Sequence, residues 1–140
     1  MRKLLLVTTI VVASLGTGFA QKPQKPSTSK AVAVAFFDEE RLRHAEGRAA
    51  LKDFEYFFTM IHEIVDRDFP DVELRILGPG ELLRLPDGMS LNVQNMRPEI
   101  GYVLAAPGKK HRVLTGIQTD ADFACAAAEF YRKASPACPK

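Results

Sequence analysis

Apolar residues recur along the chain with two different periods, and these periods predict the order of its elements. Ala31 to Phe37 contains no polar residue, which is typical of a central strand covered on both faces. From Arg48 to Asp68 the apolar positions are spaced three and four apart, as on one face of an amphipathic helix. The apolar stripe consists of Leu51, Phe54, Phe58, Ile61 and Val65, widened by Phe57 and Ile64. Val72 to Leu77 alternates apolar and charged residues and predicts a half-exposed strand.

The last third of the chain predicts a hairpin followed by a helix. An apolar run from Ile100 to Ala106 reverses at Pro107-Gly108 and leads into a second short run, His111 to Leu114. Proline followed by glycine favours a type II turn, because glycine takes a positive φ there without strain. Thr119 or Asp120 is then a suitable N-cap for the closing helix. The core face of that helix is predicted to be Phe123, Ala127, Phe130 and Ala134.

The predicted order is therefore strand, long helix, strand, irregular connection, hairpin and helix. Strands that alternate with helices indicate an α/β protein. Right-handed crossovers would pack the long helix and the C-terminal helix against one mixed β-sheet of about four strands. A chain of 140 residues has room for one such domain, which we place at 31–134, with 135–140 as a C-terminal tail.

The first thirty residues have the pattern of an export signal and a linker. Arg2 and Lys3 precede an apolar stretch, Leu4 to Leu15, that is too short to span a bilayer, and Gly18 to Ala20 supplies the small residues of a cleavage site. We expect residues 1–20 to be a cleaved signal peptide rather than an uncleaved anchor. The polar residues 21–30 predict a flexible linker. The mature protein would be periplasmic or secreted, without stable membrane insertion after cleavage.

Charge does not point to nucleic acid. The chain has 19 Lys and Arg against 17 Asp and Glu, but Arg2 and Lys3 would leave with the signal and bring the balance to zero. The expected partner is a protein or a small molecule that the sequence does not identify. A basic cluster, Lys109 to Arg112, sits at the hairpin turn, where it could hold an anion or an acidic partner or simply be solvated.

This order of elements, with a proline just before the hairpin, resembles the thioredoxin-like fold. The residues that carry the resemblance are Pro98, Ile100 to Leu104, Pro107 to Lys109, Val113, Leu114, Gly116 and the closing helix. The resemblance implies a cis-proline at Pro98 that faces the family's Cys-x-x-Cys site. That site would fall in Phe36 to Arg41, which reads F-F-D-E-E-R. Because dithiol exchange needs a thiolate and a resolving thiol, we expect a redox-silent relative that acts as a non-catalytic binding or interaction module.

The two cysteines, Cys125 and Cys138, lie near the C-terminus. By helical period Cys125 points about 200° away from Phe123, where the tail could fold back and bring Cys138 within bonding range. In an oxidising compartment we expect a disulfide between them. The alternatives are two free thiols, a bond to a partner protein, or a redox-active pair in a thiol-disulfide oxidoreductase or redox chaperone.

Neither a metal nor a cofactor is expected. His62 and Asp66 are spaced four apart on the predicted long helix, but H-E-I-V-D lacks the second histidine of a zinc-protease helix. A solvated helix face is the preferred interpretation, and a metal-assisted hydrolase around His62 is the remaining alternative.

The connection from Gly78 to Arg97 is rich in Gly, Pro, Asn and Gln. Long loops inside compact domains are often functional. Its candidate ligand-binding residues are Arg84, Asn92, Gln94, Asn95 and Arg97. The alternative is that the amide side chains satisfy the backbone of the connection itself.

Overall fold

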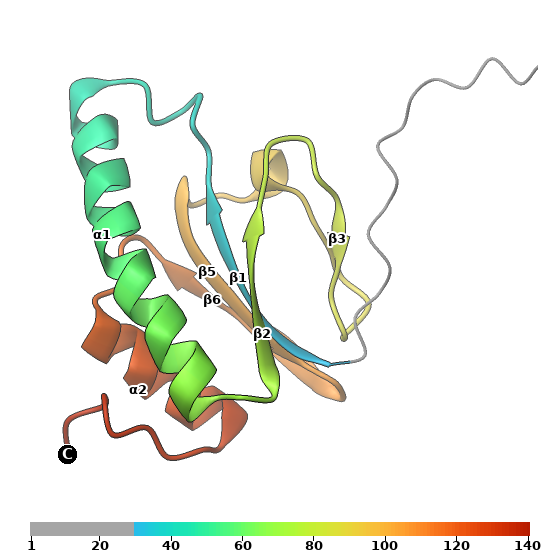
Figure 1. Ribbon diagram of the computed structural model, residues 1–140. Helices are drawn as coiled ribbons and strands as arrows, with labels where there is room; N and C mark the ends of the chain where they lie inside the picture. Colours follow the sequence, from blue (N-terminus) through green and yellow to red (C-terminus); the bar gives the residue numbers. More distant parts are fainter. Residues whose placement is uncertain (1–29) are drawn as a thin grey trace, which may run out of the picture.

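The computed structural model describes residues 30–140 (Figure 1). The predicted signal peptide and all of the predicted linker except Lys30 lie outside these residues. The elements, in chain order, are β1 (Ala31–Phe37), α1 (Ala45–Asp68), β2 (Val72–Leu77), β3 (Leu83–Arg84), β4 (Ser90–Leu91), the 3-10 helix η1 (Val93–Asn95), β5 (Ile100–Ala106), β6 (Lys109–Thr115) and α2 (Asp120–Tyr131).

Four strands form one mixed sheet in the order β2-β1-β5-β6. Strand β1 is parallel to β2 and antiparallel to β5, and β5 is antiparallel to β6. Helices α1 and α2 lie together on one face of this sheet (Figure 1). The predicted α/β class, with a long helix and a C-terminal helix on a four-stranded mixed sheet, is confirmed.

The connection between β2 and β5 covers the other face of the sheet. Strands β3 and β4 pair with each other through Leu83 and Leu91, in a ladder separate from the main sheet. The apolar residues of the connection that pack against this face are Leu83, Leu85, Leu91 and Val93, and they meet Val32, Val34 and Phe36 of β1. Ala33 and Ala35 face the helices instead. Strand β1 is therefore buried on both sides, as its unbroken apolar sequence predicts.

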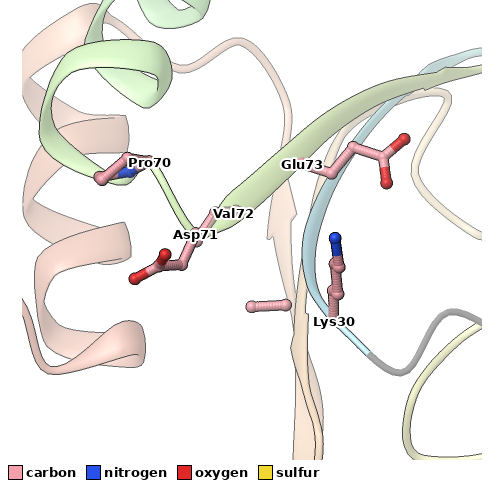
Figure 2. A pocket seen from close by; sticks show the side chains of 6 residues that line it. Lys30, Pro70, Asp71, Val72 and Glu73 are labelled. Carbon is pink, nitrogen blue, oxygen red and sulfur yellow. The ribbon is translucent and has the colours of Figure 1, made fainter.

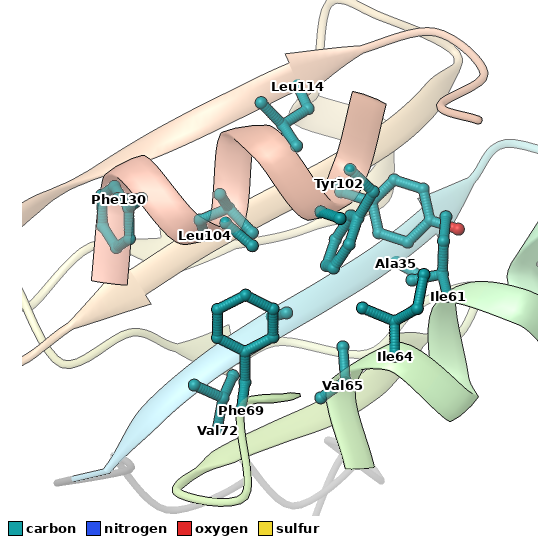
Figure 3. Packing of buried hydrophobic residues seen from close by; sticks show 14 of the residues in the cluster. Ala35, Ile61, Ile64, Val65, Phe69, Val72, Tyr102, Leu104, Leu114 and Phe130 are labelled. Carbon is teal, nitrogen blue, oxygen red and sulfur yellow. The ribbon is translucent and has the colours of Figure 1, made fainter. Parts of the chain in front are cut away.

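The larger core lies between the sheet and the two helices (Figure 3). Helix α1 contributes Ile61, Ile64 and Val65, which lie beside Phe69 at its end, and Tyr102 and Leu104 come from β5 (Figure 3). From α2 the buried residues are Phe123, Ala124, Ala127 and Phe130. The prediction that Ala134 belongs to this face is wrong. Helix α2 ends at Tyr131, because Arg132 takes a left-handed conformation (φ 54°), and Ala134 is exposed.

Helix α1 begins at Ala45, three residues before the predicted start. His44 is the N-cap, and its Nδ1 accepts a hydrogen bond from the backbone N–H of Gly47 at 2.7 Å. A Cβ at Gly47 would lie 2.5 Å from the same ring atom. Glycine is a weak helix former, but at this position it is the residue that admits the histidine cap.

The hydroxyl of Tyr102 is buried and has no hydrogen-bond partner among the described residues. An unsatisfied buried polar group destabilises a fold by about 1–3 kcal/mol. We expect Tyr102→Phe to leave the free energy of unfolding unchanged or to raise it by about 1 kcal/mol in urea denaturation. Tyr131→Phe is the matched control, because the Tyr131 hydroxyl donates to the Val32 carbonyl at 2.7 Å and its loss should be destabilising. Equal destabilisation by both substitutions would show that Tyr102 has a partner.

Candidate functional site

The segment that follows β1, residues 38–41, forms a corner of the chain. The resemblance would place a thiol pair there, but the structure has an ion pair. Arg41 Nε donates to Asp38 Oδ2 at 2.7 Å, and the Arg41 backbone N–H donates to Asp38 Oδ1 at 3.1 Å. Burial alone would raise the pKa of Asp38, but the hydrogen bonds and charge of Arg41 outweigh it and lower the pKa below its ordinary value. The guanidinium also donates to the carbonyls of Val93, Met96 and Arg97, at 3.4, 2.9 and 3.2 Å. Arg41 therefore fastens the corner to the end of the connection.

The cis-proline expected at Pro98 is not present. No peptide bond among residues 30–140 is cis, so the bond before Pro98 is trans. A trans bond before proline is favoured by about 0.5–1 kcal/mol. In this chain the Arg97 carbonyl, which belongs to that bond, is also held by Arg41 Nη1. Pro98 still lies close to the corner, because the Asp38 backbone N–H donates to the Glu99 carbonyl at 2.7 Å.

The candidate ligand-binding residues of the connection are only partly brought together. Asn92, Gln94 and Asn95 belong to the turn of η1, whereas Arg84 lies on β3. The Asn92 side chain accepts from the backbone N–H of Gln94 at 3.0 Å, so this amide satisfies the connection itself. A hollow of about 280 Å³ lies between the corner and η1, and Gln94 is the only one of the five candidates among the residues that line it. The geometry thus favours a local role for Asn92 and leaves Gln94 beside a hollow.

Cys125 and Cys138 are joined by a disulfide, with 4.7 Å between their Cα atoms. Cys125 is half-buried on α2, and Cys138 packs against the helix-side core. The tail is held in place before this bond, because the buried Ser135 donates through its hydroxyl to Asp68 at 2.7 Å. The disulfide thus fastens the C-terminal tail onto α2.

Basic side chains gather at the tip of the hairpin formed by β5 and β6. We define the hairpin-tip surface as Lys109, Lys110, His111 and Arg112 of β6 together with Arg132 at the end of α2. It borders two hollows. One, of about 540 Å³, is lined by Lys109, Lys110, His111, Arg112, Glu129, Phe130 and Arg132. The other, of about 720 Å³, is lined by Pro86, Asp87, Met89, Gly108, Lys109, Lys110 and His111.

The cations of the hairpin-tip surface are held to different degrees. Lys109 Nζ lies 4.3 Å from the centre of the Phe130 ring and donates to the Phe130 carbonyl. Arg112 Nη1 donates to Glu129 Oε2 at 3.0 Å. Lys110 and Arg132 form no ion pair with any residue of the described part of the chain. These two charges are the ones available to a ligand.

Asp87 fixes the connection to the hairpin tip. Its Oδ2 accepts from the backbone N–H of His111 at 3.0 Å and lies 2.6 Å from His111 Nδ1, while Oδ1 accepts from the backbone N–H of Met89 at 3.0 Å. Burial alone would raise the pKa of Asp87, but the hydrogen bonds from His111 and Met89 outweigh it and lower the pKa. The sequence does not indicate a role for Asp87, because Asp87 and His111 are 24 positions apart and no pattern links them.

The lowered pKa of Asp87 predicts a pH dependence of stability. A depressed carboxyl pKa stabilises the fold above the ordinary value of 3.8, and this contribution is lost as the pH falls through the lower, folded-state value. Between about pH 4 and pH 2 we expect the free energy of unfolding of the wild type to fall more steeply than that of Asp87→Asn. Urea denaturation at each pH measures it, with the exposed Asp66→Asn as control. Parallel profiles for the wild type and Asp87→Asn would contradict the assignment.

The other sequence candidates are unremarkable in the structure. His62 Nδ1 lies 3.4 Å from Asp66 Oδ2, with both side chains more than half exposed. Residues 30–140 contain no group of three or more His, Cys, Asp or Glu side chains placed to hold a metal ion.

Within residues 30–140 no helix has the length and apolar character needed to cross a membrane. Comparison of the chain with family models, with curated proteins and with solved structures gives no match.

Proposed function

We propose that the chain is an exported, non-catalytic binding module of thioredoxin-like layout, and that it binds an acidic segment of a protein partner at the hairpin-tip surface. The strand order β2-β1-β5-β6, with β1 parallel to β2 and an antiparallel hairpin beside it, supports the layout. The pattern of residues 1–20 and the disulfide support export, since disulfides persist in oxidising compartments.

The observation that carries the proposal is the local excess of positive charge at the hairpin tip. Of the 19 Lys and Arg in the chain, four precede residue 30, which leaves 15 in residues 30–140 against 17 Asp and Glu. The hairpin-tip surface is thus a basic region on a domain that carries a small net negative charge. Lys110 and Arg132 have no ion-pair partner among the described residues, and charge complementarity of this kind steers and orients an acidic ligand.

Apolar surface beside the cations favours a peptide over a simple anion. The Met89 side chain is 54% exposed and lines the larger hollow together with Pro86. An unbranched, polarizable methionine adapts to varied apolar side chains. A segment that carries both acidic and apolar residues would contact Lys110 and Arg132 with its carboxylates and Met89 with an apolar side chain.

The same surface lacks the parts of a hydrolytic site. Asp87 and His111 are arranged like the orienting acid and base of a nucleophilic enzyme, but no Ser, Thr or Cys lines either hollow. The corner after β1 contains no cysteine, and the two cysteines of the chain bond to each other elsewhere. These features support binding without catalysis.

The test is fluorescence anisotropy with a labelled peptide of alternating glutamate and leucine. We expect the double variant Lys110→Glu, Arg132→Glu to bind about tenfold more weakly or worse, because both attractive charges become repulsive. The matched control, Arg84→Glu with Arg97→Glu, reverses two exposed cations of the connection and should bind like the wild type. Failure of the wild type to bind, or equal losses in both variants, would contradict the proposal. Binding of a sulfated polysaccharide but not of the peptide would contradict a protein ligand and indicate a polyanionic carbohydrate.

A further inference from the structure

The four-stranded sheet has two outer strands, β2 and β6, and no strand of residues 30–140 pairs with the outer side of either. Strand β6 is protected against pairing. Its first four residues are basic, and Asp87 accepts a hydrogen bond from the backbone N–H of His111. Charged residues and a side chain that covers the backbone are the usual means by which an edge strand avoids adding another strand.

Strand β2 is less protected, because only two of its residues are charged, Glu73 and Arg75, and they are of opposite sign. Its sequence, V-E-L-R-I-L, contains no proline, glycine or lysine, and Ile76 is 47% exposed. An edge of six residues, four of them apolar, that carries no net charge is a template for another strand. A protein that protects β6 and leaves β2 open has β2 available for a specific partner.

The charges of β2 match those of a second copy of the same strand. Glu73 and Arg75 flank Leu74 and share one face of the sheet, where Arg75 donates to Glu73 through two hydrogen bonds of 2.7 and 3.2 Å. Glu73 projects from the start of the strand (Figure 2). An antiparallel second copy with its two-fold axis at Leu74 would place Glu73 opposite the second Arg75, and Arg75 opposite the second Glu73. Parallel pairing would instead oppose like charges, which is destabilising.

The apolar residues of β2 are also arranged symmetrically about Leu74. Around a two-fold axis at Leu74, Val72 of one copy would lie opposite Ile76 of the other, on the face that carries the helices, because Ile76 is paired in register with Ala35 of that face. This contact would cover the exposed Ile76 twice in each dimer. A two-fold interface of this kind uses one surface patch on both subunits and closes without further growth.

We propose that two copies of the chain associate through antiparallel pairing of β2 about Leu74 and join their four-stranded sheets into one continuous sheet. The dimer does not depend on the binding function proposed for the hairpin tip, because β2 and β6 are opposite edges of the sheet.

Sedimentation velocity of the purified full chain over a range of concentrations tests the dimer. We expect concentration-dependent dimerisation, weakened about tenfold or more by Glu73→Arg alone or Arg75→Glu alone, because each variant opposes like charges. The double variant Glu73→Arg, Arg75→Glu should dimerise like the wild type, since the exchanged pattern is again self-complementary. A mixture of the two single variants should form a heterodimer. The control Lys52→Glu reverses an exposed cation on α1 and should have no effect.

A chain that stays monomeric at every concentration overturns the proposal. A dimer that is indifferent to the single charge reversals places the interface elsewhere and also overturns it. Circular dichroism of each variant separates loss of pairing from loss of folding.

A cysteine on the two-fold axis gives an independent readout. Leu74→Cys places the two new thiols opposite each other, and mild oxidation should give a disulfide-linked dimer on a non-reducing gel. Tyr56→Cys, at a residue that is 66% exposed on α1, is the matched control and should stay monomeric. Equal cross-linking of both variants would contradict the register. Peptide binding at the hairpin tip, measured on the same samples, reports separately on the proposed function.

Discussion

Replacing Phe123 by alanine is expected to lower the free energy of unfolding by about 4 kcal/mol. Phe123 is fully buried in the first turn of α2, and its ring centre lies 5.1 Å from that of Tyr102 in an edge-to-face arrangement. Its loss leaves a cavity between helix and sheet, where the hydrogen-bonded strands cannot close in.

Urea denaturation followed by circular dichroism measures this loss. The control is Tyr56→Ala, because Tyr56 is 66% exposed and its removal should change stability by no more than about 0.5 kcal/mol. Similar effects of the two substitutions would show that α2 does not pack on β5 as described.

Removing the disulfide is expected to lower the free energy of unfolding by about 3 kcal/mol, mainly because the unfolded chain loses a cross-link. Cys125 and Cys138 are 13 positions apart in the sequence and hold the tail against α2. The double variant Cys125→Ser, Cys138→Ser should therefore be less stable than the wild type and insensitive to reducing agent. The reduced wild type should approach the stability of the variant.

Peptide binding separates a structural role of this bond from a redox role. If the bond only holds the tail, the double variant binds the acidic peptide like the wild type at temperatures where it is folded. Loss of binding in a fully folded double variant would favour the thiol-disulfide alternative.

The strands and helices with a sustained hydrophobic period were predictable from the sequence. Strands β1 and β2 occupy the predicted ranges, and so does β5 of the hairpin. Helix α1 ends at Asp68, as the following Pro70 indicates, although its start was placed too late. In each case the local pattern and the tertiary packing favour the same conformation, so the pattern alone is sufficient.

The layer formed by the connection could not be predicted. Strands β3 and β4 contain two residues each, which is too short for a two-residue alternation to stand out. Their leucines are positioned by packing against the face of β1 that points away from the helices. That partner lies about fifty residues earlier in the chain. The sequence does not mark the end of α2 either, because Arg132, rather than a glycine, takes the left-handed conformation that terminates it.

The hairpin-tip surface was visible in the sequence only in part. Four consecutive basic residues, Lys109 to Arg112, mark it, but Arg132 comes from another segment, and so do Asp87 and Met89 in the adjoining hollow. Only the fold brings these residues together. Only their residue type marks the five polar candidates of the connection. Residue type does not distinguish a side chain that binds a ligand from one that caps its own turn, as Asn92 does.

The most direct measurement is a titration of the isotope-labelled chain with the acidic peptide, followed through its backbone amide NMR signals. Binding at the hairpin-tip surface predicts that the signals of Lys110, Arg112 and Arg132 shift, while those of the corner at Asp38 and Arg41 stay in place. Shifts confined to the corner or to residues 92–97, with none at the hairpin tip, would contradict the proposed site.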